Sequence, residues 1–109
     1  MSDSTDGGTG TIVRTWRGRI RTADREEYRA YLEQTGLAEY RATAGNRGAW
    51  VLYRDLGDGS SEVVTVSVWA SLDAIRDFAG DDVERAVFYP QDDRFLLDRD
   101  TTVTHHEVG

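Results

Sequence analysis

Residues 49–70 read AWVLYRDLGDGSSEVVTVSVWA, and this stretch holds two strand patterns with a turn between them. Ala49–Asp55 and Ser61–Ala70 are rich in β-branched and aromatic residues, a composition that is typical of β-strands. The intervening cluster Gly57–Ser60 suits the positive φ angles of tight turns, because it contains two glycines. Two strands joined by a short glycine-rich link predict a β-hairpin.

Upstream of the hairpin, the segment Thr11–Arg21 reads TIVRTWRGRIR and alternates in polarity, which predicts a strand. Because successive strand side chains point to opposite faces, its residues fall into two sets. One set is Ile12, Arg14, Trp16, Gly18 and Ile20, and the other is Val13, Thr15, Arg17 and Arg19. Arginine occurs in both sets, so neither face of this strand is expected to be purely hydrophobic core.

Between these strands, a helix is predicted to begin at Thr22, which is followed by acidic residues in the first turn. Its apolar stripe has the spacing i, i+3, i+4 and consists of Tyr28, Tyr31 and Leu32. Gly36 is expected to end this helix, and residues 37–40 are expected to add a further helical turn. Ala44–Gly48 contains two glycines and is predicted to be a loop.

After the hairpin, a second helix is predicted to begin with Ser71 as its N-cap and to end at Gly80. Its apolar side chains keep helical spacing and are Leu72, Ile75, Phe78 and Ala79. A short helix is then predicted over Asp81–Phe88, and Pro90 stops it. The inward side of this short helix would carry Val83, Ala86 and Val87.

The last strand is predicted over Thr101–Val108, after an irregular arm at Gln91–Asp100. The resulting order, β-α-β-β-α-β, predicts a ferredoxin-like α+β fold, a four-stranded antiparallel sheet with both helices on one face. The other face would be apolar and uncovered, so a second copy of the chain is the expected cover and a homodimer is expected. The single domain spans residues 11–109, and residues 1–10, MSDSTDGGTG, are expected to form a flexible tail.

The composition excludes several kinds of chemistry. The chain has 109 residues, a formal net charge of −7, no cysteine and no lysine, since all 13 basic residues are arginine. Thiolate nucleophiles, disulfides, cysteine metal sites and lysine Schiff bases are therefore excluded. Because an acidic surface repels phosphate, no nucleic-acid partner is expected. The sequence has no apolar run of transmembrane length and opens without a signal peptide, so a cytoplasmic protein with no membrane partner is expected.

Five short motifs follow one another between residues 12 and 108. They are IVRTWRG at 12–18, VWAS at 68–71, FAG at 78–80, FYPQD at 88–92 and HHEV at 105–108. In their order and spacing they resemble the dimeric α+β barrel proteins, in particular the antibiotic biosynthesis monooxygenase-like group. The resemblance implies a homodimer with a small-molecule pocket in each subunit, between the sheet and its helices. Members of this superfamily oxidise aromatic polyketides without metal or flavin, cleave haem, or isomerise or decompose small substrates.

Aromatic residues supply the candidate ligand pocket. A pocket for a planar, aromatic small molecule is predicted to be lined by Trp50, Tyr53, Trp69, Phe78, Phe88 and Tyr89. The competing interpretation is ordinary packing in the core and at the dimer interface, where aromatic side chains also dominate.

Three residues are candidates for catalysis, namely Arg14, Trp16 and His105. Arg14 shares a strand face with Trp16 and is suited to orienting a ligand oxygen, although a salt bridge to a carboxylate is the alternative. His105 and His106 are neighbours on a strand, so they point to opposite sides and cannot both bind one metal. A neutral imidazole at His105 could take a proton from an acidic phenol or enol, and the alternative is a merely hydrogen-bonded strand residue.

Neither a metal nor another cofactor is expected. The haem-degrading relatives carry a proximal histidine after the second helix, and an ungapped alignment from Trp69 places Phe88 there, which cannot ligate iron. The favoured hypothesis is a cofactor-independent monooxygenase-like protein, because cofactor-free oxygenation needs a base and a site that stabilises the substrate anion. The alternatives are a related isomerase or decarboxylase and a non-catalytic dimeric ligand-binding protein, since a fold alone does not fix a function.

Overall fold

A computed structural model describes residues 10–109, so the tail predicted over 1–10 lies outside the described residues except for Gly10. The elements are strand β2 (Ile12–Arg21), the 3-10 turn η1 (Thr22–Asp24), helices α1 (Arg25–Gln34) and α2 (Gly36–Ala42), strands β3 (Asn46–Asp55) and β4 (Ser60–Trp69), helices α3 (Leu72–Ala79) and α4 (Asp92–Phe95), and strands β5 (Leu96–Arg99) and β6 (Thr104–Glu107). Within the described part of the chain, no helix has the length and apolar character that crossing a bilayer requires.

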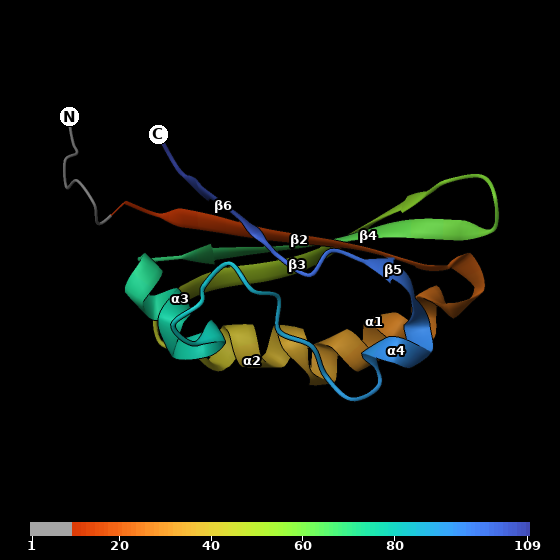
Figure 1. Cartoon of the computed structure of the whole chain (residues 1–109), viewed down its shortest axis with the longest axis horizontal. Coiled ribbons are helices and arrows are strands. Elements are labelled where there is room, and N and C mark those ends of the chain that lie inside the picture. The colour runs from red at the N-terminus through yellow and green to blue at the C-terminus, as the bar shows by residue number, and fades with distance from the viewer. Residues whose placement is uncertain (1–9) are drawn as a thin grey trace.

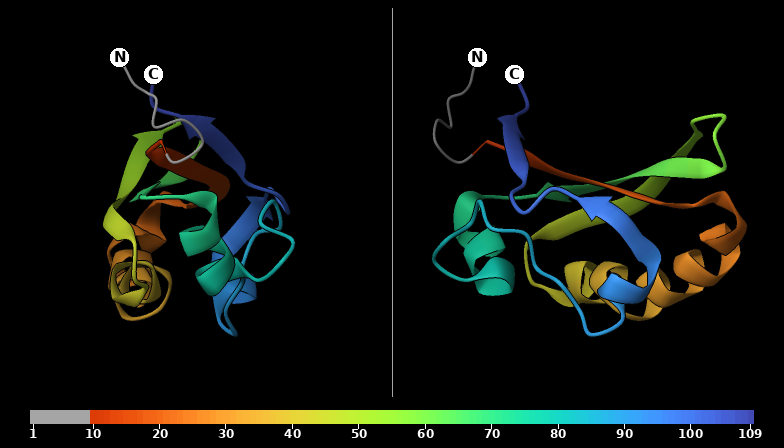
Figure 2. Two further views of the ribbon diagram at one scale, coloured as in Figure 1. Left: turned by 90° about the vertical axis from the view of Figure 1, so that its left-hand side faces the viewer. Right: turned by 45° about the vertical axis from the view of Figure 1, so that its right-hand side comes forward.

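The sheet is antiparallel and has five strands in place of the four predicted. Its order is β3-β4-β2-β5, and β6 also pairs with β2. Strands β5 and β6 share one edge of β2, because β5 pairs with Gly18–Ile20 and β6 pairs with Ile12–Thr15. The helices lie together on one side of the sheet, and no described segment covers the other side (Figures 1 and 2). The predicted ferredoxin-like α+β arrangement is confirmed.

The predicted hairpin is confirmed as β3 and β4, which pair over nearly their full length. The turn is closed by the N–H of Leu56, which donates to the carbonyl of Ser60 at 3.0 Å. Gly57 and Gly59 have φ angles of 83° and 87°, so each supplies the left-handed backbone that this turn requires. Ser71 caps α3 as predicted, because its hydroxyl accepts the N–H of Ala74.

The helix predicted over 81–88 is wrong, because the segment has no helical structure. The backbone of this segment is engaged elsewhere, since the N–H of Ala86 donates to Thr101 and the carbonyl of Glu84 accepts from Val103. The carbonyls of Val83 and Arg85 accept hydrogen bonds from a side chain on β2. Carbonyls that a helix would use internally are therefore committed to distant partners.

The irregular arm predicted over 91–100 is also wrong. The segment forms α4 and then β5, which pairs with β2. Phe95 and Leu96 anchor it, because both side chains are buried in the core. The partner of this short strand lies about 80 positions earlier in the chain, so local sequence pattern gives no sign of the pairing.

The two faces of the sheet differ in an unusual way. On β4 the side chains under the helices are Ser61, Val63, Thr65, Ser67 and Trp69, whereas the opposite face carries Glu62, Val64, Val66 and Val68. On β4, the buried face is thus more polar than the face without helices. Trp50 and Leu52 of β3 pair with Val66 and Val64 on that second face, and more than half of each side chain is exposed. We call this second face, made by Val64, Val66, Val68, Trp50 and Leu52, the open face.

Candidate functional site

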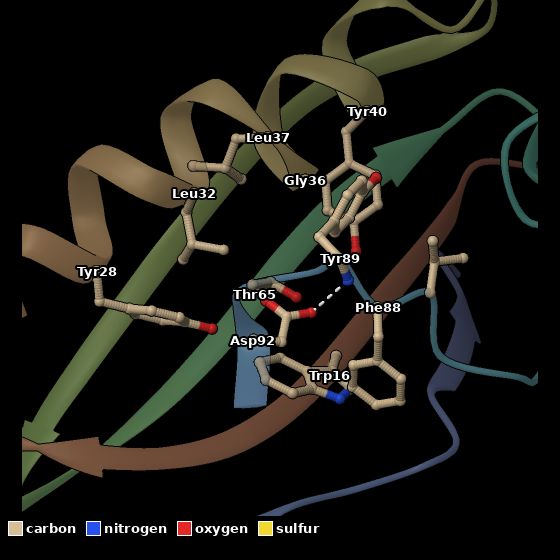
Figure 3. A pocket seen from close by; sticks show the side chains of 11 residues that line it. Trp16, Tyr28, Leu32, Gly36, Leu37, Tyr40, Thr65, Phe88, Tyr89 and Asp92 are labelled. Carbon is tan, nitrogen blue, oxygen red and sulfur yellow. Dashed lines mark hydrogen bonds between the residues drawn. The ribbon is translucent and has the colours of Figure 1, made fainter. Parts of the chain in front are cut away.

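A cavity lies between the buried face of the sheet and helices α1 and α2. Its walls come from Trp16 on β2, Thr65 on β4, Tyr28 and Leu32 on α1, Gly36, Leu37 and Tyr40 on α2, the segment Val87–Tyr89, and Asp92 on α4 (Figure 3). The volume open to the centre of a water-sized sphere is about 30 Å³. This is room for about two waters, so the cavity is narrow in this conformation.

Trp16 forms one wall of the cavity and is held from several directions. Its indole Nε1 donates to the carbonyl of Asp100 at 2.8 Å. Its ring packs edge-to-face with Phe88, with the ring centroids 6.3 Å apart. A Cβ atom at Gly18 would lie 2.6 Å from the Trp16 ring, so only glycine lets the indole lie along the strand. The ring that borders the cavity is therefore fixed in place before any ligand arrives.

A second aromatic cluster adjoins the cavity at Tyr40. The Tyr40 ring packs against Phe78 at 4.7 Å and against Trp69 at 6.0 Å between centroids. The indole Nε1 of Trp69 donates to the buried hydroxyl of Ser67 at 2.9 Å. The guanidinium carbon of Arg14 lies 5.7 Å from the centre of the Phe78 ring. Tyr40 thus separates the cavity from a buried cation.

Arg14 is only 1% exposed, although it carries a positive charge. Its Nη1 donates to the carbonyl of Val83 at 2.6 Å, and its Nη2 donates to that of Arg85 at 3.3 Å. Its Nε is buried and has no hydrogen-bond partner. Burial lowers the pKa of Arg14 and the nearby Tyr40 hydroxyl opposes this, but arginine stays protonated near neutral pH.

The charge of Arg14 is not balanced within the described residues, where no carboxylate forms an ion pair with it. Arg17, three residues further along β2 on the opposite face, has such a partner, since its Nε pairs with Glu62 at 2.6 Å. A buried charge is normally compensated by an opposite charge, because desolvation makes an isolated one unfavourable. Arg14 therefore has the character of an anion-binding group.

His105 lies directly opposite Arg14 in the pairing of β2 with β6. The Nη1 of Arg14 approaches the Nε2 of His105 to 3.1 Å. Because arginine only donates, Nε2 accepts this bond and Nδ1 carries the proton of the neutral ring. Burial, and then the charge of Arg14, lower the pKa of His105, so the imidazole is neutral at neutral pH. His106 points to the other face and is exposed.

Asp92 is a cavity residue that sequence reasoning missed, since the run DDR at 92–94 is typical of a solvated surface. The Asp92 side chain is 5% exposed, and its Oδ2 accepts the backbone N–H of Tyr89 at 2.6 Å. Burial raises the pKa of its carboxyl, and the Tyr89 N–H partly offsets this. Burial also raises the pKa of Tyr28, whose hydroxyl points toward Asp92 in Figure 3. The other missed lining residues are Tyr28, Leu32, Gly36, Leu37, Tyr40, Thr65 and Val87.

The predicted pocket residues are distributed over three places. Phe88 and Tyr89 line the cavity with Trp16, whereas Trp69 and Phe78 lie in the adjoining cluster with Arg14. Tyr53 is on the buried face but outside the cavity, under the guanidinium of Arg25 at 4.5 Å. Trp50 is on the open face, on the far side of the sheet from the cavity. The alternation along β3 places Trp50 there, because its neighbour Ala49 is buried under the helices.

The segment 87–89 closes the cavity with side chains. The hydroxyl of Tyr89 donates to Glu39 of α2 at 2.8 Å, and the backbone N–H of Gln91 donates to the hydroxyl of Tyr31 at 3.1 Å. Within the described residues, Val87 and Phe88 have no backbone hydrogen bond to another part of the chain. The wall beside Trp16 is thus held by packing and by the guanidinium of Arg99, 4.7 Å from the centre of the Phe88 ring, and it can move without breaking a backbone bond.

Comparison with known proteins finds no family model and no curated protein that matches the chain. Solved structures do match. A proposed antibiotic biosynthesis monooxygenase from Bacillus cereus aligns with a TM-score of 0.65 and 16% identity, over 91% of this chain and 93% of that one. SnoaB, a cofactor-independent oxygenase from Streptomyces nogalater, aligns with a TM-score of 0.62 and 16% identity, over 92% and 94%. An uncharacterized NIPSNAP-like domain protein from Burkholderia xenovorans aligns with a TM-score of 0.53 and 17% identity, over 90% and 83%.

Proposed function

We propose that this chain, which has the fold of the antibiotic biosynthesis monooxygenase-like proteins, is a cofactor-independent oxygenase for an aromatic substrate with an acidic C–H or O–H group. The observation that carries the proposal is the buried guanidinium of Arg14, which has no carboxylate partner among the described residues and lies behind Tyr40, a wall residue of the aromatic cavity. A substrate anion would supply the missing negative charge. The description of SnoaB as a cofactor-independent oxygenase is consistent with this chemistry.

The proposed reaction needs only the substrate and O₂. A CH₂ group that lies between two aromatic rings and is conjugated through them to a carbonyl loses a proton, and the resulting enolate can reduce O₂. The net change is CH₂ + O₂ → C=O + H₂O, in which the carbon is oxidised and O₂ is reduced to one carbonyl oxygen and one water. Arg14 would stabilise the enolate oxygen, because a positive charge in a dry site strongly favours an anion.

His105 is the proposed proton acceptor. In the structure its Nε2 is occupied by Arg14. A substrate carbonyl oxygen that takes over this arginine N–H would release Nε2, which could then accept the proton as the enolate forms. Trp16 would form the surface on which the substrate ring stacks, with Val87 and Phe88 as the movable wall. That wall has to move, since pockets for drug-sized ligands span about 300–1,000 Å³.

We also propose that two copies of the chain pair through the open face. Valine, leucine and tryptophan side chains without cover form a natural interface, and a two-fold axis would place the same patch on both partners. Light scattering is expected to give about twice the chain mass of 12.2 kDa. A mass equal to that of one chain at micromolar concentration would contradict the pairing.

Oxygen uptake tests the proposed reaction. With a panel of anthrone-type substrates, the wild type is expected to consume O₂ above the buffer blank. His105→Ala and Trp16→Ala are expected to lose this uptake, whereas His106→Ala, the matched control on the other face, is expected to keep it. Uptake that never exceeds the blank across the panel would contradict the oxygenase.

One observation favours a second candidate, a ligand-binding protein without turnover. His105 does not line the cavity, and its Nε2 is engaged by Arg14. A binding protein would show a ligand-dependent rise in Tm while O₂ uptake stays at the blank. The two outcomes separate the candidates in one set of samples.

A further inference from the structure

Asp92 stands out among the groups that the proposed reaction does not use. It is a buried carboxylate on the cavity wall, on the same side of the sheet as Trp16. Figure 3 shows its carboxyl group facing the interior, below Tyr89 and beside the Trp16 ring. Within the described residues, no arginine or histidine forms an ion pair with it. The ion pairs of this region are instead made by its neighbours, Arg94 with Glu27 and Arg99 with Asp93.

The groups around Asp92 favour a neutral ligand group that donates a hydrogen bond over an anionic one. An ionised carboxylate only accepts hydrogen bonds, and that of Asp92 already accepts the backbone N–H of Tyr89 at Oδ2 and interacts with the Tyr31 hydroxyl. The surrounding wall is mostly apolar or aromatic, and its other polar groups are the hydroxyls of Tyr28, Tyr40, Thr65 and Tyr89. Such a wall repels a carboxylate or phosphate and attracts a neutral group that donates a hydrogen bond. A phenolic hydroxyl is such a donor, because it stays protonated at neutral pH.

Two charges of opposite sign lie near the cavity, Asp92 on its wall and Arg14 behind Tyr40. Arg14 and Trp16 are two residues apart on the same face of β2, which is about 7 Å along the strand. Asp92 lies on the wall beside Trp16, whereas Arg14 lies beyond Tyr40. A planar molecule over Trp16 can thus present an anionic oxygen toward Arg14 and a hydroxyl toward Asp92.

We propose that Asp92 determines the specificity of the cavity by accepting a hydrogen bond from a ring hydroxyl, so that the cavity selects hydroxylated aromatic ligands over their ethers. The inference deepens the proposed function, because it names the substrate class for the same cavity. Its test uses binding alone and needs no turnover. A failure of the oxygenase reaction and a failure of this inference are therefore distinguishable.

The experiment compares 1-naphthol with 1-methoxynaphthalene by calorimetric titration at pH 7. The two probes differ by one methyl group, which removes the hydroxyl donor. The wild type is expected to bind 1-naphthol at least about tenfold more tightly, as a hydrogen bond to a charged acceptor predicts. In Asp92→Asn the preference is expected to fall to within about threefold, with the affinity for 1-methoxynaphthalene unchanged. Asp93→Asn, the adjacent exposed control, is expected to keep the full preference.

Each possible result of the titrations either supports or overturns the proposed role of Asp92. Equal binding of both probes to the wild type overturns the inference and leaves the cavity as a ligand site, and this comparison needs no variant to fold. Binding of neither probe overturns both the inference and the proposed pocket. A preference that survives in Asp92→Asn, or that Asp93→Asn also loses, assigns the selectivity elsewhere and overturns the role of Asp92. A preference lost only in Asp92→Asn supports it even if O₂ uptake is never observed.

Discussion

The two faces of the sheet show opposite departures from an ordinary domain. The face under the helices buries Arg14, Thr65 and Ser67, whereas the open face presents Val66, Trp50 and other apolar side chains without cover. A monomeric protein that optimised its own stability would place these groups the other way round. This distribution agrees with the proposed ligand site under the helices and with the proposed pairing of two copies through the open face.

The contrast is sharpest on β2, where two arginines lie three residues apart on opposite faces. Arg14 is enclosed and bonds to carbonyls and an imidazole, whereas Arg17 is half-exposed and pairs with Glu62. The same side chain thus serves two purposes according to the face it occupies. Local structure that departs from the stability optimum is expected where a protein binds or reacts.

The largest effect is expected from Arg14→Met. This change leaves the carbonyls of Val83 and Arg85 and the Nε2 of His105 without their donor, so it should lower the free energy of unfolding by about 2–4 kcal/mol. It should also abolish substrate-dependent O₂ uptake. Arg17→Met, the control on the other face, should lower stability much less and keep the uptake. Urea unfolding measures the change in stability. Equal losses of stability in the two variants would contradict the proposed difference between the faces.

The second effect concerns the open face. Leu52→Arg places a charge in the proposed interface twice, once from each copy, and should weaken pairing by about a hundredfold, or ~2.7 kcal/mol. Leu72→Arg changes a partly exposed leucine on α3, on the helix side, and should leave pairing intact. Sedimentation at a series of concentrations measures both. Dissociation by Leu72→Arg but not by Leu52→Arg would place the interface on the helix side.

A smaller effect is expected from Gly18→Ala. The added methyl would lie 2.6 Å from the Trp16 ring, so the indole has to shift, and we expect a loss of about 1–2 kcal/mol. Because Trp16 borders the cavity, affinity for 1-naphthol should fall as well. Gly10→Ala meets no atom within 4 Å and should change neither quantity. Unchanged stability and binding in Gly18→Ala would show that Trp16 is not held as described.

The smallest expected effect is on the pH dependence of stability. The pKa of His105 is lowered below its ordinary value of 6.5 in the folded chain, so the unfolded chain binds more protons between these two values. Stability is therefore expected to fall as pH drops below 6.5. His105→Asn should remove this loss, because its amide oxygen can still accept from Arg14 but does not titrate. His106→Asn is the matched control, and thermal unfolding at pH 5 to 8 measures all three proteins. A loss below pH 6.5 that persists in His105→Asn would assign it to another group.

Elements with strong local patterns could be predicted from the sequence, and elements that depend on distant partners could not. The hairpin β3–β4 and the N-cap of α3 follow from turn glycines and a capping serine. By contrast, β5 exists because it pairs with β2, and residues 81–88 stay non-helical because Arg14 and the chain near Thr101 bind their backbone. These causes lie far away in the sequence.

The candidate site shows the same division. Parity along β2 correctly grouped Arg14 with Trp16, and parity along β6 separated His105 from His106. Asp92 could not be predicted as a site residue, since an acidic run in the sequence gives no sign that one of its members is buried by the packing of α4.

The three tryptophans offer the most direct test of the central claim that ligand binding belongs to one face and self-association to the other. Trp16 borders the cavity, Trp50 lies on the open face and Trp69 is fully buried, so their indole N–H signals report on separate places. In ¹⁵N-labelled protein, 1-naphthol is expected to shift the Trp16 signal and leave that of Trp50 in place, whereas dilution should shift only Trp50. A ligand-induced shift of Trp50 with no change at Trp16 would contradict the account.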